Sequence, residues 1–209
     1  MTQYVVCQRA CLEYHKEMAY QLKISLDGSK PPIWRRILIP DNFTFIDLHA
    51  VIQAAMGWEN AHLFAFRYPG EFRGDIGIPM EEDWMGNEVQ DARRIRVRDH
   101  LQTPKQKMHY EYDFGDGWQH TILLEKVTDE KILAPQCLKG KGACPPEDCG
   151  GIWGYYSLVE SINDPKSPEH KDAREWLGMK KSERWDVEAL DMDECRRRVA
   201  YYQERYFDL

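Results

Sequence analysis

Alternation of apolar and polar residues in several short segments constrains the fold of this chain most strongly. Every second residue is apolar in residues 20–26, and the same period of two recurs in residues 62–68, 107–114 and 118–124. This period is typical of β-strands that bury one face and leave the other polar. The sequence therefore predicts a sheet whose strands are spread over more than half of the chain.

Turn residues between these segments predict how the strands are connected. Asp27-Gly28 and Pro31-Pro32 separate residues 20–26 from the apolar-rich residues 33–39, and Gly115-Asp116-Gly117 separates residues 107–114 from 118–124. Short connections of this kind join antiparallel neighbours. We expect an antiparallel sheet built from hairpins.

Helical patterns fill the remaining segments. Thr44 and Asp47 form a capping-box pattern at the start of a helix that ends at Gly57. Further helices are expected at residues 153–162 and 168–177. A last helix should begin near Asp191, with one apolar stripe made of Met192, Cys195, Val199, Tyr202 and Tyr206. The fold class is thus α+β, with helices packed on the sheet and a helical C-terminal part.

The same patterns divide the chain into three parts. Residues 1–18 place apolar side chains at helical spacing and predict a leading amphipathic helix. Residues 19–178 form the α+β domain, and residues 179–209 form a C-terminal helical extension packed on that domain. With 209 residues, 43% of them hydrophobic and 30% charged, the chain can bury the core of a globular protein.

Charge and hydropathy limit the classes of partner. The net charge of −7 argues against a nucleic-acid surface over the whole molecule, although Arg93, Arg94, Arg96 and Arg98 leave a local basic patch open. We expect no membrane partner, because no apolar run is long enough to span a bilayer. The N-terminus lacks a signal-peptide layout, so we expect a cytoplasmic protein whose cysteines are thiols or metal ligands.

Two loops carry most of the candidate site residues. The DFGDGW segment, residues 113–118, falls on a predicted hairpin turn, and the CPPEDCGG segment, residues 144–151, falls in a predicted irregular loop over residues 134–152. If the loops meet, their carboxylates could bind a hard cation or serve acid–base chemistry. Alternatively, these acids only bond nearby backbone amides. The ligand-binding candidates are Asp113, Asp116, Trp118, Glu147, Asp148, Trp153 and Tyr155, with an exposed groove expected beside the three aromatic residues.

Cysteine and histidine residues give two candidate metal sites. Cys137, Cys144 and Cys149 could bind zinc together with His120, although neither cysteine interval is the tight pair typical of zinc ribbons. The alternative is a set of small buried thiols. A second set, Cys7, Cys11 and His15, would share one face of the leading helix, where an apolar stripe explains the spacing equally.

Common catalytic signatures are missing from the sequence. There is no Gly-x-Ser-x-Gly, Gly-x-Gly-x-x-Gly, Walker or His-Glu-x-x-His motif, and the Asp-Phe-Gly at residue 113 lacks the other kinase motifs. His49 and His62 could each act as a base, but either could equally be a hydrogen-bonded residue at the core edge. These absences favour a protein that is not an enzyme.

A set of motifs resembles the plasmid pRiA4b ORF-3-like family. The segments are YQLKISLDGSKPPIWRRILIP, TFIDLHAVIQAAMGWENAHLFAF, YEYDFGDGWQH and CPPEDCGGIWGY, within residues 20–178. The resemblance implies an uncharacterised α+β domain of bacteria and archaea, sometimes found in mobile-element settings, with no established activity. It implies that family motifs include Trp34, His49, Trp58, His62, Asp113, Asp116, His120, Cys144, Glu147, Asp148 and Gly150-Gly151. The family often has a second histidine two residues after His62, where this chain has Phe64.

Three functional hypotheses follow. The first is a non-catalytic module that binds a ligand or partner at the DFGDGW turn and the CPPEDCGG loop. The alternative is a zinc-dependent hydrolase in which His120, Cys144 and Cys149 hold the ion and Asp116 or Glu147 activates water. The second alternative is a DNA-associated accessory protein of mobile elements, which rests on the family setting and the arginine run.

Overall fold

The computed structural model describes residues 18–70, 75–79, 89–180 and 182–206. The predicted leading helix, with Cys7, Cys11 and His15, lies outside the described residues apart from residue 18. None of the helices in the described segments is both long enough and apolar enough to cross a membrane.

A single mixed sheet, almost entirely antiparallel, forms the centre of the described structure. Its strand order is β5-β4-β3-β6-β7-β1-β2-β8, and only β4 and β5 run parallel. The expected α+β fold with an antiparallel sheet is therefore confirmed. The strands are β1 Ala19–Leu26, β2 Trp34–Pro40, β3 Phe64–Arg67, β4 Ile76–Gly77, β5 Gln90–Asp91, β6 Lys107–Tyr112, β7 Trp118–Thr128 and β8 Gln136–Lys141.

Both predicted hairpins are present. β1 pairs with β2 from Ser25 opposite Trp34, and β6 pairs with β7 from Tyr112 opposite Trp118. The DFGDG residues consequently form the turn between β6 and β7, at the end of the sheet. Buried and partly exposed residues alternate along β1 and β6, as the period of two predicts.

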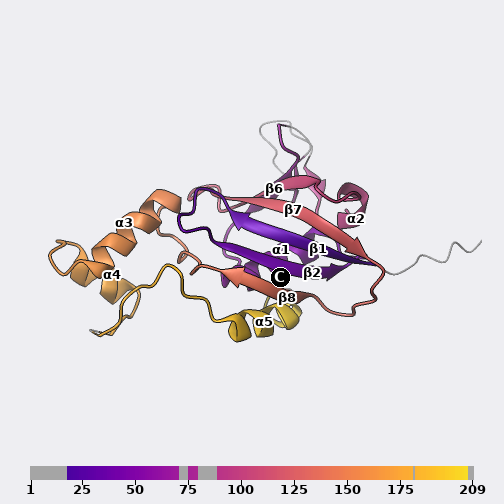
Figure 1. Cartoon of the computed structure of the whole chain (residues 1–209). Helices are drawn as coiled ribbons and strands as arrows, with labels where there is room; N and C mark the ends of the chain where they lie inside the picture. Colours follow the sequence, from indigo (N-terminus) through magenta and orange to yellow (C-terminus); the bar gives the residue numbers. More distant parts are fainter. Residues whose placement is uncertain (1–17, 71–74, 80–88, 181, 207–209) are drawn as a thin grey trace, which may run out of the picture.

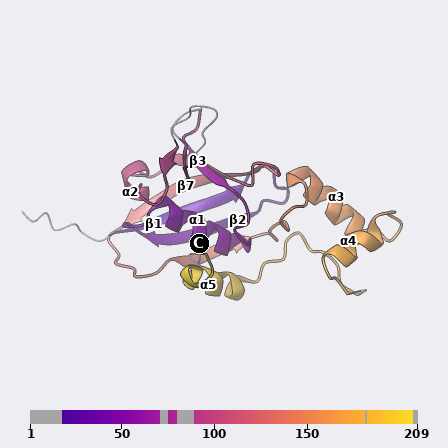
Figure 2. The same ribbon diagram turned by 180° about the vertical axis from the view of Figure 1, so that it is seen from behind.

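Helix α1, Phe45–Met56, covers one face of the sheet (Figures 1 and 2). The predicted capping box is formed: the Thr44 side chain accepts a hydrogen bond from the Asp47 amide, and the Asp47 carboxylate accepts one from the Thr44 amide. Gly57 ends the helix with a φ of 96°, a conformation that favours glycine. Local sequence signals are sufficient to define both ends of this helix.

The other helices lie at the edges of the sheet. They are α2 Val97–His100, α3 Gly151–Asn163, α4 His170–Trp176, α5 Met192–Ala200 and α6 Tyr202–Tyr206. Helices α3 and α4 pack against each other beyond one end of the sheet, whereas α5 packs against α1 and β8 (Figure 1).

The C-terminal helix differs from its prediction. Instead of one continuous helix, α5 and α6 are separated at Tyr201, whose φ of −110° and ψ of 27° depart from helical values. Tyr202 is buried and packs against Phe43 at 5.7 Å between ring centroids, while Tyr201 remains exposed. Packing of Tyr202 thus accompanies the break in the helix.

The predicted irregular loop contains a short strand. β8 lies within residues 134–152, where Pro and Gly predicted no regular element, and pairs with β2 from Trp34 opposite Lys141 to Leu38 opposite Gln136. The short strands β4 and β5 also lie outside the segments in which the sequence pattern predicts strands. Pairing with an existing strand satisfies backbone groups regardless of local propensity, which is why the sequence pattern missed these strands.

A buried arginine ties β2 to the segments that lead to the CPPEDCGG loop. Arg35 is 1% exposed and donates hydrogen bonds to the carbonyl oxygens of Ala55, Trp34, Lys141 and Gly142, at 2.9–3.0 Å. It therefore joins the C-terminal turn of α1 to the end of β8. This contact fixes the start of the chain segment that carries the candidate site.

Candidate functional site

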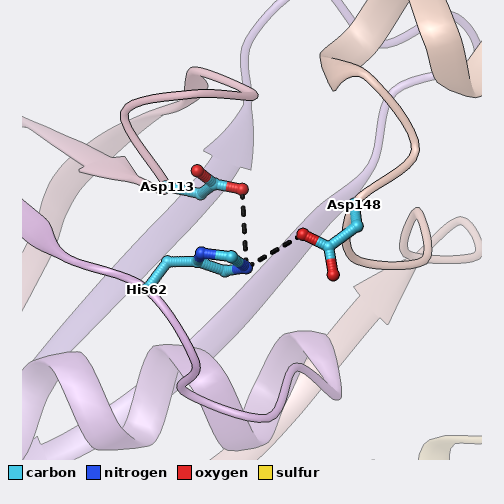
Figure 3. Close-up of side chains that lie close together, drawn as sticks. All are labelled: His62, Asp113 and Asp148. Atoms are coloured by element: carbon cyan, nitrogen blue, oxygen red, sulfur yellow. Dashed lines mark ion pairs between the residues drawn. The ribbon is translucent and has the colours of Figure 1, made fainter.

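The DFGDGW turn and the CPPEDCGG loop lie side by side, although 25 residues of chain separate them (Figure 3). The Gly150 amide donates a hydrogen bond of 3.1 Å to Asp116 Oδ2. The backbone approaches even more closely at Gly151, where a Cβ atom would lie 2.2 Å from the Asp116 carbonyl oxygen. Only glycine fits at this position, which also has a φ of 67°.

A second set of contacts holds the segment that follows α1, residues 59–61, against the CPPEDCGG loop and the end of β6. Glu147 Oε1 accepts hydrogen bonds from the Tyr112 hydroxyl at 2.5 Å and from the Glu59 amide at 3.2 Å. The Ala61 amide in turn donates to the Tyr112 hydroxyl oxygen. Burial and the bond to Glu147 raise the pKa of Tyr112 well above its usual value, so the hydroxyl stays protonated and donates.

His62, Asp113 and Asp148 converge where these three segments meet (Figure 3). His62 Nε2 lies 3.1 Å from Asp148 Oδ1 and 3.7 Å from Asp113 Oδ2. We call these three residues the junction cluster. Among the described residues, it is the single group of at least three His, Cys, Asp or Glu side chains whose ligand atoms all lie within 4.8 Å of one another.

The local backbone fixes the carboxylate of Asp113. Its Oδ1 atom accepts hydrogen bonds from the amides of Gly115 and Asp116, and its own amide donates to the Leu63 carbonyl oxygen beside His62. Asp113 adopts a φ of 56° at the start of this tight turn. Because Oδ1 is bound within the turn, Oδ2 is left to face the imidazole.

The other two members differ in exposure. The His62 side chain is 30% exposed, yet its Nε2 atom is buried and forms no hydrogen bond within the described structure. The Asp148 side chain is 70% exposed and approaches from the outer side of the loop. The junction cluster thus has a fixed inner side and an accessible outer side.

A cleft of about 560 Å³ opens beside the junction cluster. Its polar end includes His62 and Asp113, and most of its wall is apolar. Leu63 and Phe114 are 42% and 50% exposed at this cleft. The remaining lining residues are Ile46, His49, Asn60, Ala61, Phe64, Ile78 and Gly115.

His49 lines the same cleft but has a different environment. Its ring stacks on Phe64 at 3.7 Å, its Nδ1 lies 2.9 Å from the Tyr110 hydroxyl, and its Nε2 lies 2.6 Å from Asn60 Oδ1. Burial lowers the pKa of His49 to about 3, despite the hydrogen bond to Asn60. The ring is therefore neutral, with Nε2–H donating to Asn60 and Nδ1 accepting from Tyr110.

The predicted aromatic groove is wrong. Trp118 and Tyr155 are buried, at 1% and 0% exposure, and only Trp153 is on the surface, at 82%. Trp118 and Tyr155 join the hydrophobic core, because β7 and α3 turn these faces inward. The candidate acids Asp116 and Glu147 brace the two loops through the backbone contacts described above.

The structure does not bring the predicted zinc ligands together. His120 is buried in β7, with Nδ1 3.0 Å from the Trp118 carbonyl oxygen, and burial lowers its pKa to about 4. Cys137 on β8 instead contacts Cys195 on α5, at 3.4 Å between sulfur atoms. Burial raises the pKa of both Cys144 and Cys149 to about 12, which disfavours the thiolate form.

Acids pair with three of the four arginines in the predicted basic patch. Arg93 and Arg94 both pair with Asp91, at 2.8 and 3.5 Å. Arg98 lies 3.7 Å from Asp41. These pairs offset the field that would attract a phosphate backbone.

Sequence reasoning identified His62 as a candidate base but did not group it with the two loops. No spacing rule connects His62 to Asp113 or Asp148, because the contact depends on β3 pairing with β6. The one signal in the sequence that links these three residues is that each belongs to a motif of the family that the chain resembles.

Comparisons with known proteins place the chain in a family. The family model described as plasmid pRiA4b ORF-3-like protein matches residues 18–194. The uncharacterized protein y4hQ of Sinorhizobium fredii (strain NBRC 101917 / NGR234) is 36% identical over 181 residues, which cover 86% of this chain and 89% of that protein. The crystal structure of MM3350, a protein of unknown function from Methanosarcina mazei Go1, is also similar, with a TM-score of 0.71, 37% identity, and coverage of 85% of this chain and 97% of that one.

The residues that match the family model include all strands of the sheet, α1, the DFGDGW turn and the CPPEDCGG loop. This chain belongs to the plasmid pRiA4b ORF-3-like family.

Proposed function

We propose that this protein is a ligand-binding module whose site is the cleft beside the junction cluster. The observation that carries the proposal is the convergence of His62, Asp113 and Asp148, from three separate segments, next to a cleft with mostly apolar walls. A concave apolar surface with a few convergent polar groups is typical of small-molecule sites.

The side chains that line the cleft indicate the class of ligand. Leu63 and Phe114 keep large apolar surfaces exposed, next to buried Phe64. Exposed apolar side chains that line a cleft with polar groups at its rim are typical of ligand-binding grooves. The ligand should therefore have an apolar body that packs on these side chains and a polar head group that faces His62 and Asp113.

A binding role is favoured over nucleophilic catalysis. The described residues that line the cleft include no serine, threonine, cysteine or lysine. Both predicted catalytic acids are hydrogen-bonded to backbone amides, Asp116 to Gly150 and Glu147 to Glu59. The hydrolase that would use His120, Cys144 and Cys149 is not proposed, because those side chains do not form a group of ligands.

The proposal can be tested with three small probes that share a phenyl ring: benzyl alcohol, benzylamine and phenylacetate. Each is titrated into the ¹⁵N-labelled full chain, and amide shifts are followed by NMR. We expect saturable shifts at Leu63, Phe64 and Gly115. Without metal, benzylamine should bind more tightly than phenylacetate, because two carboxylates and one histidine lie at the polar end.

A matched pair of variants controls this test. Ala61→Trp fills the cleft from an exposed lining position, whereas Ala189→Trp adds the same side chain at an exposed position that does not line it. Ala61→Trp should abolish the shifts and Ala189→Trp should keep them. Shifts that do not saturate, or that survive in Ala61→Trp, would contradict the proposal.

A further inference from the structure

We infer that His62, Asp113 and Asp148 bind one divalent metal ion, which provides the polar anchor of the cleft. The ion site rests on the geometry of the junction cluster. Its role as an anchor rests on the proposed function, because it requires a ligand in the cleft.

The two ion-pair distances in the cluster are close to those between ligand atoms of one coordination sphere. Ligand atoms that share one ion at about 2.1 Å, at tetrahedral or octahedral angles, lie roughly 3.0–3.4 Å apart. His62 Nε2 lies 3.1 Å from Asp148 Oδ1 and 3.7 Å from Asp113 Oδ2. Small side-chain movements would place all three atoms around a single ion.

The surroundings of His62 are a second observation. Its Nε2 atom is buried, has no hydrogen bond of good geometry in the described structure, and faces carboxylates from two separate loops at 3.1 and 3.7 Å. Trp118 Nε1 and His120 Nε2 are also buried without a hydrogen bond, but among the described residues only His62 belongs to a group of convergent ligand atoms. A metal ion bound between the imidazole and the carboxylates would satisfy Nε2 and both oxygens at once.

The surrounding residues hold two of the ligands in place. Amides of Gly115 and Asp116 bind Asp113 Oδ1, so that Oδ2 faces His62. The Asp113 amide also binds the Leu63 carbonyl oxygen, which joins the turn to the residue that follows His62. Bonds of this kind orient metal ligands and reduce the rearrangement that binding requires.

Charge balance also favours a cation. Within the described residues, no lysine or arginine forms an ion pair with Asp113 or Asp148, and His62 is the basic partner of both. One imidazole nitrogen and two carboxylate oxygens suit ions such as Mn²⁺, Fe²⁺ or Zn²⁺, whereas a thiol-rich site would select softer ions.

Three protein ligands leave coordination positions open. Two of the three, His62 and Asp113, line the cleft, so the open positions would be within reach of a bound molecule. A head group with metal-binding oxygens, such as a carboxylate or phosphate, would complete the sphere. The inferred ligand class is therefore an apolar molecule with an anionic head.

The inference can be tested by calorimetry with Mn²⁺ on the full chain after removal of metal by a chelator. Mn²⁺ is chosen because it prefers oxygen and imidazole ligands, which limits binding by the cysteines. We expect one ion per chain. His62→Gln and Asp148→Asn should each weaken binding by at least about tenfold, whereas Asp172→Asn, an exposed acid on α4, should leave it unchanged.

Circular dichroism and thermal melting establish that each variant is folded. Absence of Mn²⁺ binding by the native chain would overturn the inference, as would equal binding by the native chain and both cluster variants. Asp148→Asn keeps the test decisive if His62→Gln is unstable, because the Asp148 side chain is 70% exposed.

The phenyl probes separate this inference from the proposed function. With Mn²⁺ bound, phenylacetate should bind more tightly and benzylamine more weakly than without it. If benzyl alcohol saturates the cleft but Mn²⁺ does not bind, the metal site is wrong and the binding module stands. If Mn²⁺ binds to the cluster but no probe enters the cleft, the ion site stands and the proposed function is wrong.

Discussion

His49 and His62 line the same cleft, yet they differ in burial and in the partners of their ring nitrogens. His49 is buried, and both ring nitrogens have partners, the Tyr110 hydroxyl and Asn60 Oδ1. His62 is partly exposed, and its buried Nε2 faces two carboxylates without a hydrogen bond. The polar contacts of His49 are thus complete within the fold, whereas His62 faces carboxylates from two separate loops.

Arg35, like His49, is a buried polar residue whose side chain has hydrogen-bond partners within the fold. It lies inside the core and has four carbonyl oxygens as partners, while its neighbour Arg36 pairs with Glu125 on the partly exposed face.

Replacing Arg35 should have the largest effect on stability. Arg35→Met removes the hydrogen bonds to the end of α1 and to β8, and we expect a loss of about 3–5 kcal/mol in the free energy of unfolding. Arg36→Met should cost at most about 1 kcal/mol, because its ion pair is partly solvated. Urea unfolding of both variants measures the difference, and similar losses would contradict the structural role of Arg35.

The contact between the two loops depends on one glycine. Gly150 and Gly151 have φ values of 85° and 67°, but a Cβ atom would clash only at Gly151, at 2.2 Å from the Asp116 carbonyl oxygen, whereas at Gly150 it would lie 3.6 Å from the Gly154 Cα. Gly150→Ala should cost about 1–2 kcal/mol through its backbone conformation alone. Gly151→Ala should cost more and should also displace the loop that carries Asp148.

Thermal or urea unfolding compares the two glycine variants, and Mn²⁺ binding reports the position of Asp148. Equal stability and equal binding would show that the loops do not approach each other as described.

Buried histidines should make the protein less stable in acid. Burial lowers the pKa of His49 to about 3 and that of His120 to about 4. The unfolded chain gains a proton on each histidine near pH 6.5, whereas the folded protein does not until much lower pH. Their stabilising contribution is therefore complete above about pH 6.5 and is lost as the pH falls toward 4.

The variant His120→Gln isolates one of these contributions. Between about pH 6 and pH 4.5, the slope of unfolding free energy against pH should decrease by roughly 1 kcal/mol per pH unit relative to the native chain. Urea unfolding at several pH values measures the slope. An unchanged slope would mean that His120 titrates normally in the folded protein.

Asp148→Asn should have the smallest effect on stability. The Asp148 side chain is 70% exposed, so without metal we expect a change within about 0.5 kcal/mol. This loss is much smaller than the loss expected for Arg35→Met, because a residue of the junction cluster should contribute to binding and not to folding. A large loss of stability would assign Asp148 to the fold instead.

Local sequence signals predicted the hairpins and α1. The turn between β6 and β7 follows from Gly115-Asp116-Gly117, and the capping box from Thr44 and Asp47, because these features depend on residues close in sequence. The strand β8 was missed for the opposite reason. It forms because its backbone pairs with β2, and no local pattern in residues 134–152 reveals this pairing.

The candidate site could be predicted only in part. The acids of the two loops were identified, together with the condition that the loops must meet, and Asp113 and Asp148 do lie close together. The sequence did not reveal that Trp118 and Tyr155 are buried, since either face of a strand or helix can point inward. Nor could it bring His62 to Asp113, because that contact requires the pairing of β3 with β6.

The most direct test of the contrast between the two histidines is an NMR measurement of imidazole ¹⁵N shifts during titration of the metal-free chain with Zn²⁺. We predict that Zn²⁺ changes the Nε2 shift of His62 and leaves both ring nitrogens of His49 unchanged. The titration is continued to several equivalents, because thiols also bind Zn²⁺ and can take up the first ions. An unchanged His62 signal, or equal changes at His62 and His49, would contradict the account.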